Sequence, residues 1–312
     1  PYPYWEQFIL PKAAKAEGCD ILHCTSNTAP VNTNLPLIIT IHDIIYLNGL
    51  KLNKSGGSWY QRLGNIYRKW IVPRVAKNAQ KIITVSHSEK KRIDQHFRFK
   101  DEKVKVVYNG VGEHFRKIDN KKELNEIREK YSLPEKFIFF LGNTDPKKNT
   151  RNVLKAYDNF LSKNKAIPLV MIDFGEQNLI SILKDIGKTH LRKNIFITGY
   201  IINSDLPAIY NLSEVFLYPS LQESFGIPML EAMACGTPVI TSNTTSMPEI
   251  ADDAAYIADP TNPGSISLGI YRLLSNHSLR NKIIQKGFKR AQEFSWRQTA
   301  EETLQIYKSL KK

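Results

Sequence analysis

The sequence predicts an α/β protein with two parallel β-sheets, each covered by helices on both faces. Nine short runs are almost continuously apolar and rich in β-branched or aromatic residues, which is typical of strands buried on both sides of a parallel sheet. Stretches with helical patterning alternate with these runs along the chain, as in doubly wound folds. At 312 residues the chain is long enough for two such domains.

The predicted elements follow one another in regular order. The predicted strands are residues 20–24, 37–43, 81–86, 103–109, 136–143, 168–175, 194–200, 214–220 and 238–243. The predicted helices are residues 59–78, 87–97, 121–131, 149–164, 176–189, 204–212, 265–276 and 278–310. The chain turns polar, with two glycines and a charged run, near residues 109–120. We therefore predict a first domain at 1–112, a second at 113–292, and a C-terminal helix at 293–312 that packs back on the first domain.

The charge is concentrated in one part of the chain. The formal net charge is +14, and residues 51–105 carry fifteen Lys or Arg against four Asp or Glu. Such a stretch suits an anionic membrane surface, a nucleic acid or an anionic substrate. Residues 1–15 lack the pattern of a secretory signal, and the three cysteines have no paired spacing. We expect a cytoplasmic protein, peripheral at the inner face of the cell membrane.

The segment "ESFGIPMLEAMACG" at residues 223–236 combines two carboxylates with a helix start and a helix end. Pro228 suits the first turn of a helix, and Gly236 suits its left-handed end. Glu223 then lies in the preceding loop, and Glu231 lies one turn into the helix. The backbone N–H groups of the loop at 224–226 and of the helix start form an anion site. A phosphate between two carboxylates suggests a sugar nucleotide.

The extended segment "ESFGIPMLEAMACGTPVI" resembles the donor-binding motif of family 4 glycosyltransferases, which are retaining enzymes of the GT-B fold with two facing Rossmann-like domains. The segments "FLGNTDPKKN", "IITIHDIIYL", "IITVSHSEKKRI", "VVYNGV" and "MPEIADDAAYIADP" also resemble family segments, in the family's order. The resemblance covers nearly the whole chain. It implies that Lys148 neutralises the leaving diphosphate and that His42 hydrogen-bonds the donor sugar.

The resemblance assigns the remaining roles by position. It implies catalytic roles for Glu223, Lys148 and His42. It implies donor binding by Glu231, Lys147, Gly142, Asn143, Ser224, Phe225, Gly226, Ile227 and Tyr200. It implies no cofactor beyond the nucleotide-sugar substrate. No Asp-x-Asp triplet occurs in the sequence, which fits a site that holds its diphosphate without a metal ion.

The chain departs from the family pattern in two places. Asn143 stands where the family often has arginine, and we expect Lys147 to supply that second positive charge. The family's first strand and glycine-rich loop have no counterpart before "PYPYWEQFILP", so we expect an incomplete N-terminal domain. A third candidate feature, His23 beside Cys19 and Cys24, is interpreted as strand packing rather than as a metal site.

The predicted function is hexose transfer, with mannose slightly favoured, from a nucleoside-diphosphate sugar such as GDP-mannose to a glycan or lipid-linked acceptor. This places the chain in polysaccharide synthesis, for example of lipopolysaccharide. A sugar-nucleotide epimerase or hydrolase on the same fold would use the same donor residues. A nucleic-acid-binding protein could use the basic stretch 51–105, but the sequence has no recognisable binding motif and the two glutamates would remain unexplained. We therefore expect no nucleic-acid partner.

Overall fold

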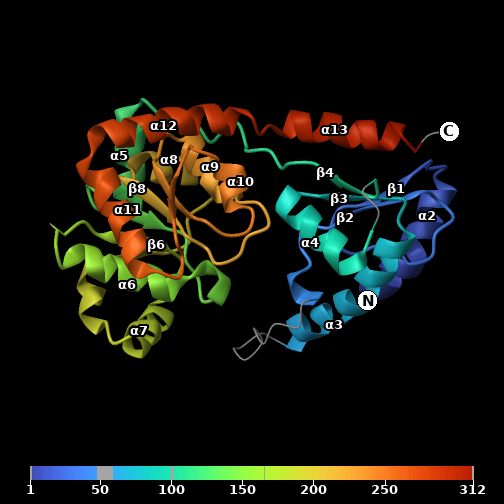
Figure 1. Cartoon of the computed structure of the whole chain (residues 1–312), viewed down its shortest axis with the longest axis horizontal. Helices are drawn as coiled ribbons and strands as arrows, with labels where there is room; N and C mark the ends of the chain where they lie inside the picture. Colours follow the sequence, from blue (N-terminus) through green and yellow to red (C-terminus); the bar gives the residue numbers. More distant parts are fainter. Residues whose placement is uncertain (1, 48–58, 100–101, 165, 311–312) are drawn as a thin grey trace. The chain divides into compact units, whose positions relative to one another are not determined.

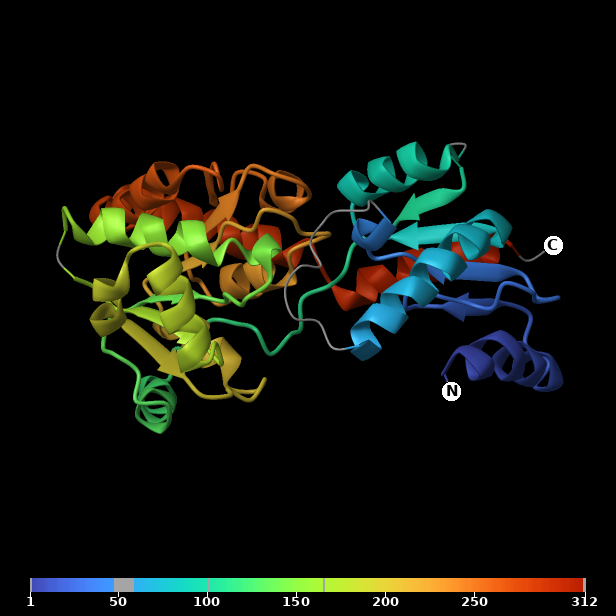
Figure 2. The ribbon, with the colours of Figure 1, turned by 90° about the horizontal axis from the view of Figure 1, so that it is seen from below.

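The computed structural model describes residues 2–47, 59–99, 102–164 and 166–310. The chain divides into two compact units. Unit 1 is Pro1–Asn109 with Arg297–Lys312, and unit 2 is Gly110–Trp296. Each unit is an α/β body with its own sheet (Figures 1 and 2). This arrangement confirms the predicted fold class.

Unit 1 is built on a four-stranded parallel sheet in the order β1-β2-β3-β4 (Figure 1). Its strands are β1 (Leu22–Cys24), β2 (Leu37–Thr40), β3 (Lys81–Thr84) and β4 (Val104–Val106). In the register of this sheet, Ile39 is paired with Ile82, and Ile83 is paired with Lys105. All four residues of β2 are buried, as the continuous apolar run predicts.

Helices cover both faces of this sheet. On one face, Ile39 and Ile82 pack in a cluster with Ile71 and Val75. The helices of unit 1 include α2 (Leu10–Ala16), α3 (Trp59–Asn78) and α4 (His87–Phe97). On the other face, Ile38 and Ile83 pack with residues of the last helix, α13 (Trp296–Lys308). A 3₁₀ turn, Ile45–Leu47, follows β2.

Two polar contacts fasten the outer segments of unit 1. His23 lies within hydrogen-bond distance of two hydroxyls, that of Tyr307 at 2.6 Å from Nδ1 and that of Thr40 at 2.8 Å from Nε2. Both ring nitrogens of His23 therefore have hydrogen-bond partners inside unit 1.

The described chain begins with α1 (Tyr2–Tyr4) and a π-helical turn, Trp5–Ile9. Glu6 in this turn is buried and accepts hydrogen bonds from three hydroxyls, those of Tyr2, Thr28 and Tyr67.

Unit 2 is built on a six-stranded parallel sheet in the order β10-β9-β8-β5-β6-β7. Its strands are β5 (Ile138–Phe140), β6 (Leu169–Ile172), β7 (Ile195–Thr198), β8 (Val215–Tyr218), β9 (Val239–Ser242) and β10 (Tyr256–Ala258). The chain moves outward from β5 to β7 and then returns to the other side of β5 as β8. The order therefore reverses between β5 and β8.

Alternate residues of these strands face opposite helical layers. Ile138 and Phe140 share a buried cluster with residues of α6, α7 and α11. Phe139 and Phe216 point the other way, with ring centroids 5.4 and 5.1 Å from that of Tyr210 in α8. The helices of unit 2 are α5 (Lys121–Lys130), α6 (Thr150–Leu161), α7 (Glu176–Asp185), α8 (Leu206–Leu212), α9 (Ile227–Ala234), α10 (Met247–Ala251), α11 (Pro263–Ser275) and α12 (His277–Gln292). Two 3₁₀ turns are Pro146–Lys148 and Thr189–Asn194.

Several elements differ from the sequence prediction. The helices α1, α2 and α10 were not among the predicted helices. The predicted helix 278–310 is two helices, α12 and α13, because a tertiary contact interrupts it: Val111 pairs with Ser295 in an isolated bridge, and Phe294 is buried. The short strand β10 was not predicted, since its three residues form no extended β-rich run. It pairs with β9 and completes the sheet.

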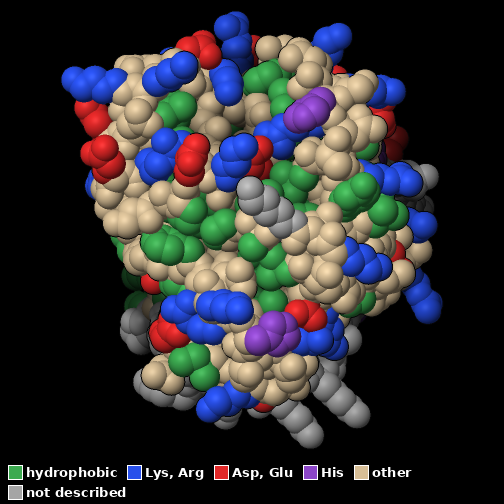
Figure 3. Space-filling view, turned by 90° about the vertical axis from the view of Figure 1, so that its left-hand side faces the viewer, with side chains coloured by type: hydrophobic (Ala, Val, Ile, Leu, Met, Phe, Trp, Pro, Cys, Tyr) green, Lys and Arg blue, Asp and Glu red, His purple; other side chains and the backbone are tan. Residues whose placement is uncertain are grey.

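The outer surface of unit 2 carries both signs of charge. On the face shown in Figure 3, Lys and Arg side chains are interspersed with Asp, Glu and apolar side chains. Ion pairs on unit 2 include Arg151 with Asp185 at 2.7 Å and Arg192 with Glu176 at 2.6 Å. This mixture contrasts with the one-sided charge of the stretch 51–105. Among the helices in the described ranges, none has the length and apolar character needed to cross a membrane.

Candidate functional site

The reversal of strand order between β5 and β8 marks the place where a ligand site is expected. In open parallel sheets, ligands bind outside the carboxyl ends of the strands at such a point. The loops that leave these two strands, residues 141–149 and 219–226, lie against each other. The N–H of Leu221 donates to the carbonyl of Lys147 at 2.8 Å. Most of the residues predicted to bind the donor lie on these two loops.

Lys148 and Glu223 form an ion pair across this point. The ammonium of Lys148 lies 2.6 Å from Oε1 of Glu223, and their side chains are 19% and 14% exposed. The Lys148 ammonium also lies 5.2 Å from the ring centroid of Tyr218, the last residue of β8. Because both charges are partly removed from water, their attraction is stronger than at the open surface. The fold thus brings together two predicted catalytic residues from separate loops.

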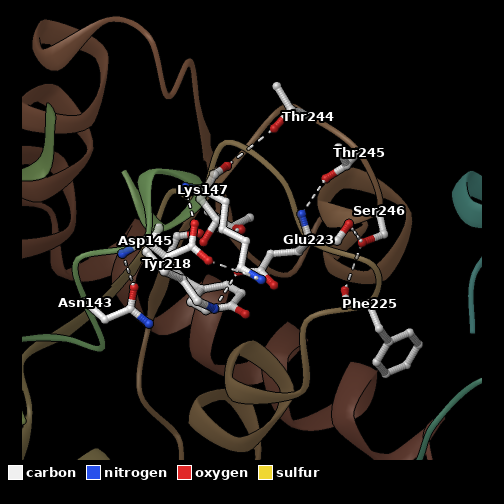
Figure 4. Close-up of polar contacts among 12 residues, drawn as sticks. Asn143, Asp145, Lys147, Tyr218, Glu223, Phe225, Thr244, Thr245 and Ser246 are labelled. Carbon is white, nitrogen blue, oxygen red and sulfur yellow. Dashed lines mark hydrogen bonds and ion pairs between the residues drawn. The ribbon is translucent and has the colours of Figure 1, made fainter. Parts of the chain in front are cut away.

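The other polar residues of the β5 loop mainly shape the loop itself. Oδ1 of Asn143 accepts from the N–H of Asp145, and Oδ1 of Asp145 accepts from the N–H of Lys147 (Figure 4). The Lys147 ammonium lies 3.6 Å from the Asp145 carboxylate. Lys147 therefore shares its charge with a neighbouring acid, whereas Lys148 faces Glu223. The role of Lys147 as a second cation toward a diphosphate stays a prediction.

Packing within unit 2 accounts for the glycine at position 142. A Cβ at this position would lie 2.2 Å from the ring of Phe140. Packing against this ring excludes any larger residue, with no ligand needed. Close approach of a diphosphate to Gly142 therefore stays a prediction.

Asn149 is a structural residue of the site that the sequence analysis did not single out. It is buried, and its amide donates to the carbonyls of Pro219 at 2.9 Å and Pro260 at 2.7 Å. Its φ of +62° lies in the left-handed region, which asparagine tolerates better than most residues. An asparagine directly after the lysine pair was the available signal. It ties the β5 loop to two neighbouring loops.

The start of α9 is formed as the sequence predicts, with Pro228 in the first turn and Gly236 left-handed at a φ of +77°. Gly226 precedes the helix with a φ of +118°, and a Cβ there would lie 2.7 Å from Cε of Met247. Ile227 is the first residue of the helix. Binding of an anion by the backbone of the loop before it stays a prediction.

Phe225 differs from what its predicted role suggests. Its side chain is buried, and its ring centroid lies 5.7 Å from that of Phe294. In Figure 4 the ring points away from Lys147 and Glu223. Phe225 therefore anchors the loop in the core, and its contribution to a ligand would come from its backbone. Ser224, beside it, is half-buried.

Glu231 is a largely buried carboxylate. The hydroxyl of Tyr210 donates to its Oε2 at 3.0 Å. Burial raises the pKa of Glu231 to about 7, although the hydrogen bond from Tyr210 acts in the opposite direction. Near neutral pH this carboxyl therefore exists in both protonation states. Its ionised form accepts hydrogen bonds and donates none, which suits recognition of a diol.

Tyr218 is a second residue that the sequence analysis missed. Its ring is buried, and burial together with the carboxylates of Glu223 and Glu231 raises its pKa well above the usual value. Its phenol therefore stays protonated and can serve as a hydrogen-bond donor to Glu223. The signal in the sequence was its place at the carboxyl end of the predicted strand "EVFLYPS", where sites are built.

The two remaining predicted residues belong to other segments of the chain. His42 belongs to unit 1 and follows β2, and its Nε2 lies 2.9 Å from the carbonyl oxygen of Thr25. Because a carbonyl only accepts, Nε2 carries the hydrogen, and in a neutral ring Nδ1 is left as an acceptor. Tyr200 follows β7, which β6 separates from β5, and it is 73% exposed. Contacts of His42 with a sugar and of Tyr200 with a base stay predictions.

Metal ligands are a separate question from the charged pair. Within the ranges that the structure describes, no three or more His, Cys, Asp and Glu side chains are grouped so as to hold a metal ion. Cys19 is exposed, Cys24 is half-buried and Cys235 is buried, all three as free thiols.

Comparison with protein families gives matches over both units. Residues 121–290 match the family described as glycosyl transferases group 1, and residues 1–114 match Glycosyltransferase Family 4. The resemblance stated from the sequence motifs is thereby confirmed.

Several curated proteins are similar in sequence. The O-antigen chain mannosyltransferase B of Escherichia coli is 35% identical over 188 residues, which are 59% of this chain and 49% of that protein. The serotype-specific mannosyltransferase WbdA of Escherichia coli is 28% identical over 288 residues, which are 89% of this chain and 34% of that protein. The chain thus spans about half of the first relative's length and about a third of the second's.

Solved structures share the fold at low sequence identity. A glycosyltransferase from Rickettsia africae ESF-5 has a TM-score of 0.75 at 20% identity, covering 96% of this chain and 79% of that one. Anabaena Alr3699/HepE in complex with UDP has a TM-score of 0.76 at 17% identity, covering 97% of this chain and 81% of that one. These likenesses concern the fold alone.

Proposed function

We propose, from the premise that this chain belongs to the family of glycosyl transferases group 1, that it transfers a hexose from a nucleoside-diphosphate sugar to a glycan or lipid-linked acceptor, with retention of anomeric configuration. Mannose is the proposed hexose, and synthesis of a surface polysaccharide is the proposed setting. The ion pair between Lys148 and Glu223 carries the proposal, because it sets a cation beside a carboxylate where the strand order reverses.

The residues around this pair match the parts of a sugar nucleotide. The diphosphate would lie at the amino end of α9, where backbone N–H groups and Lys148 offer positive charge. The sugar hydroxyls would donate to Glu223. The two ribose hydroxyls would donate to the ionised carboxylate of Glu231. In this arrangement Lys148, whose ammonium lies 2.6 Å from Oε1 of Glu223, would contact the diphosphate as well.

The chemistry needs charge stabilisation more than proton transfer by the protein. The bond between the sugar C1 and the diphosphate oxygen breaks, and the acceptor oxygen bonds to C1 from the same face. The departing diphosphate gains negative charge and takes the proton of the acceptor hydroxyl. Lys148 would stabilise that developing charge, an interaction that strengthens in the transition state. We propose that this cation and the helix end make a metal ion unnecessary.

The names of the relatives support mannose as the sugar. Curated relatives named as mannosyltransferases include O-antigen chain mannosyltransferase B, WbdA and the O-antigen chain mannosyltransferase RfbU of Salmonella typhimurium. The structure of Alr3699/HepE with UDP-glucose supports a nucleotide-sugar donor but a different base and sugar. The donor therefore has to be decided by experiment.

We further propose that unit 1 meets an anionic membrane surface during transfer. On α3, large parts of Leu63, Ile66 and Trp70 are exposed, and the guanidinium of Arg74 lies 4.2 Å from the ring centroid of Trp70. Exposed aromatics beside basic side chains suit a lipid headgroup region. Residues 51–58 and 100–101 of the predicted basic stretch lie outside the described residues.

A donor panel tests the central proposal. Purified protein would be offered GDP-mannose, UDP-glucose, UDP-galactose and UDP-N-acetylglucosamine, each with and without a lipid-linked glycan acceptor. We expect acceptor-dependent release of GDP, an α-linked product from the α-linked donor, and unchanged turnover with a chelator present. Release of nucleoside diphosphate without acceptor would instead support a hydrolase or epimerase. An inverted product or loss of turnover with chelator would contradict retention or metal independence.

Vesicle binding tests the membrane proposal separately. Vesicles containing an anionic lipid should bind the protein, and added salt should release it, because surface charges are screened within about 8 Å at physiological ionic strength. Equal binding to neutral and anionic vesicles would contradict the electrostatic part of the proposal.

A further inference from the structure

Three consecutive hydroxyl side chains in the loop between β9 and α10 contact the loop that carries Glu223 (Figure 4). They belong to Thr244, Thr245 and Ser246 and are called the hydroxyl triplet below. The Thr244 hydroxyl donates to the carbonyl of Leu221 at 3.2 Å. This contact fixes the beginning of the loop that follows β8. The hydroxyls of Thr245 and Ser246 contact residues further along the same loop.

The second and third hydroxyls hold the main chain of Glu223 on both sides. The N–H of Glu223 donates to Oγ1 of Thr245 at 3.2 Å. The Ser246 hydroxyl lies 3.0 Å from the carbonyl oxygen of Glu223 and 3.1 Å from that of Phe225, so its hydrogen is shared between them. Both backbone groups of Glu223 are therefore bonded to side chains of another loop.

The conformation of the triplet is costly, which argues that the surrounding structure imposes it. Thr245 has a φ of +54°, in the left-handed region that β-branched residues rarely adopt. Such strain persists where neighbouring contacts determine it, and it concentrates at functional sites. Ser246 and Met247 are fully buried, so the Ser246 hydroxyl is shielded from water and depends on these carbonyl partners.

We propose that Thr245 and Ser246 are positioning residues that fix the main chain of Glu223 and thereby aim its carboxylate at the ligand site. With the N–H and carbonyl of Glu223 held, the freedom that remains lies in its side-chain torsions. The carboxylate then lies 2.6 Å from the ammonium of Lys148. The structural part of this proposal is independent of the proposed function, and its kinetic part rests on it.

Hydrogen exchange tests the structural part without any donor. The variants are Ser246→Ala and Thr245→Ala, with Thr245→Ser as the conservative change that keeps the hydroxyl. Ser213→Ala is the matched control, because Ser213 is also buried and donates to a carbonyl, that of Tyr210 at 2.8 Å, before rather than after β8.

In the two Ala variants we expect amide exchange in the peptide containing Glu223 to rise about tenfold, while a peptide from β5 is unchanged. Thr245→Ser and Ser213→Ala should leave the Glu223 peptide as in the parent chain. Equal exchange in all variants, or a rise that the control reproduces, would overturn the proposal. The Thr245 variants decide the matter if Ser246→Ala does not fold.

Kinetics test the consequence for the sugar. For Ser246→Ala we expect kcat/KM for the sugar nucleotide to fall about tenfold while affinity for the free nucleoside diphosphate is unchanged, because Glu223 would contact the sugar alone. Thr245→Ser should retain the parent values. Faster exchange with unchanged kinetics would overturn the positioning role. A parent chain that transfers no sugar would instead refute the proposed function, and the exchange result would still stand.

Discussion

The two units contain parallel sheets of the same kind, but their carboxyl edges are equipped differently. In unit 1 the described strands follow in the simple order β1-β2-β3-β4, and His42, beyond β2, is hydrogen-bonded to the backbone of its own unit. In unit 2 the order reverses between β5 and β8, and the loops there present the pair of Lys148 and Glu223. The loops at the reversal of strand order in unit 2 therefore bring a cation and a carboxylate together, although both sheets are parallel.

Each unit also contains one buried glutamate with a raised pKa. Burial raises the pKa of Glu89 in unit 1 to about 7, and it does the same for Glu231 in unit 2. Glu89 is paired with the guanidinium of Arg92, whereas Glu231 is bonded by the neutral phenol of Tyr210. The guanidinium of Arg92 contacts Oε1 of Glu89 and compensates its charge within unit 1. Glu231 keeps an uncompensated charge that a ligand diol could use.

The largest expected effect separates two neighbouring lysines. Lys148→Ala should lower kcat about 10²- to 10³-fold with a smaller change in KM, because it removes charge stabilisation that acts mostly in the transition state. Lys147→Ala is the matched control and should cost less than about tenfold, since Lys147 lies beside Asp145. Initial rates of acceptor-dependent nucleoside diphosphate release measure both. Equal losses, or a rise in KM alone, would contradict the assignment.

The next effect separates the two buried glutamates. Glu231→Ala should weaken binding of the free nucleoside diphosphate about tenfold to a hundredfold, because hydrogen bonds from the ribose diol to a charged acceptor are lost. Glu89→Gln should leave this affinity unchanged. Calorimetric titration with GDP and UDP measures both, and unchanged affinity in Glu231→Ala would exclude the ribose role.

A smaller effect follows from protonation of Glu231. Because its pKa is about 7, donor affinity should fall about tenfold as pH drops from about 8 to about 6, where the carboxyl gains a proton and loses acceptor capacity. GDP-mannose is the suitable probe, since its diphosphate is esterified at both ends and does not titrate in this range. The pH dependence should vanish in Glu231→Gln, and a persisting slope would point to another group.

The same raised pKa predicts the pH dependence of stability. The folded-state pKa lies above the usual value of 4.5, so ionisation of Glu231 costs the folded state free energy. Its contribution to stability is fully present below about 4.5 and is lost as pH rises through about 7. Glu231→Gln should therefore raise the melting temperature by a few degrees at about pH 8 and change it little at about pH 4. A uniform shift at both pH values would contradict this cause.

The smallest expected effect concerns unit 1. His42→Ala should lower kcat/KM about fivefold to tenfold, the loss of one neutral hydrogen bond to the sugar, and leave affinity for the free nucleoside diphosphate unchanged. His42→Asn, which keeps a hydrogen-bonding side chain, serves as the comparison. A loss of nucleotide affinity in His42→Ala would show that the residue acts through the fold and not on the sugar.

Sequence alone determined the features that depend on neighbours along the chain. The apolar runs predicted buried parallel strands, because both faces of such a sheet are covered and the side chains on either face have to be apolar. Pro228 and Gly236 predicted where α9 begins and ends, because backbone preferences are local. The motif around Glu223 and Glu231 predicted the family for the same reason, since it is contiguous.

Tertiary structure decided which distant segments meet. The order of strands placed Lys148 against Glu223 and the hydroxyl triplet against its main chain, and no local pattern contains that order. Packing turned the ring of Phe225 into the core and split the predicted helix 278–310, where Val111 pairs with Ser295. These outcomes depend on contacts between residues far apart in the chain, and such contacts are set by the three-dimensional fit of whole elements rather than by periodicity within one of them.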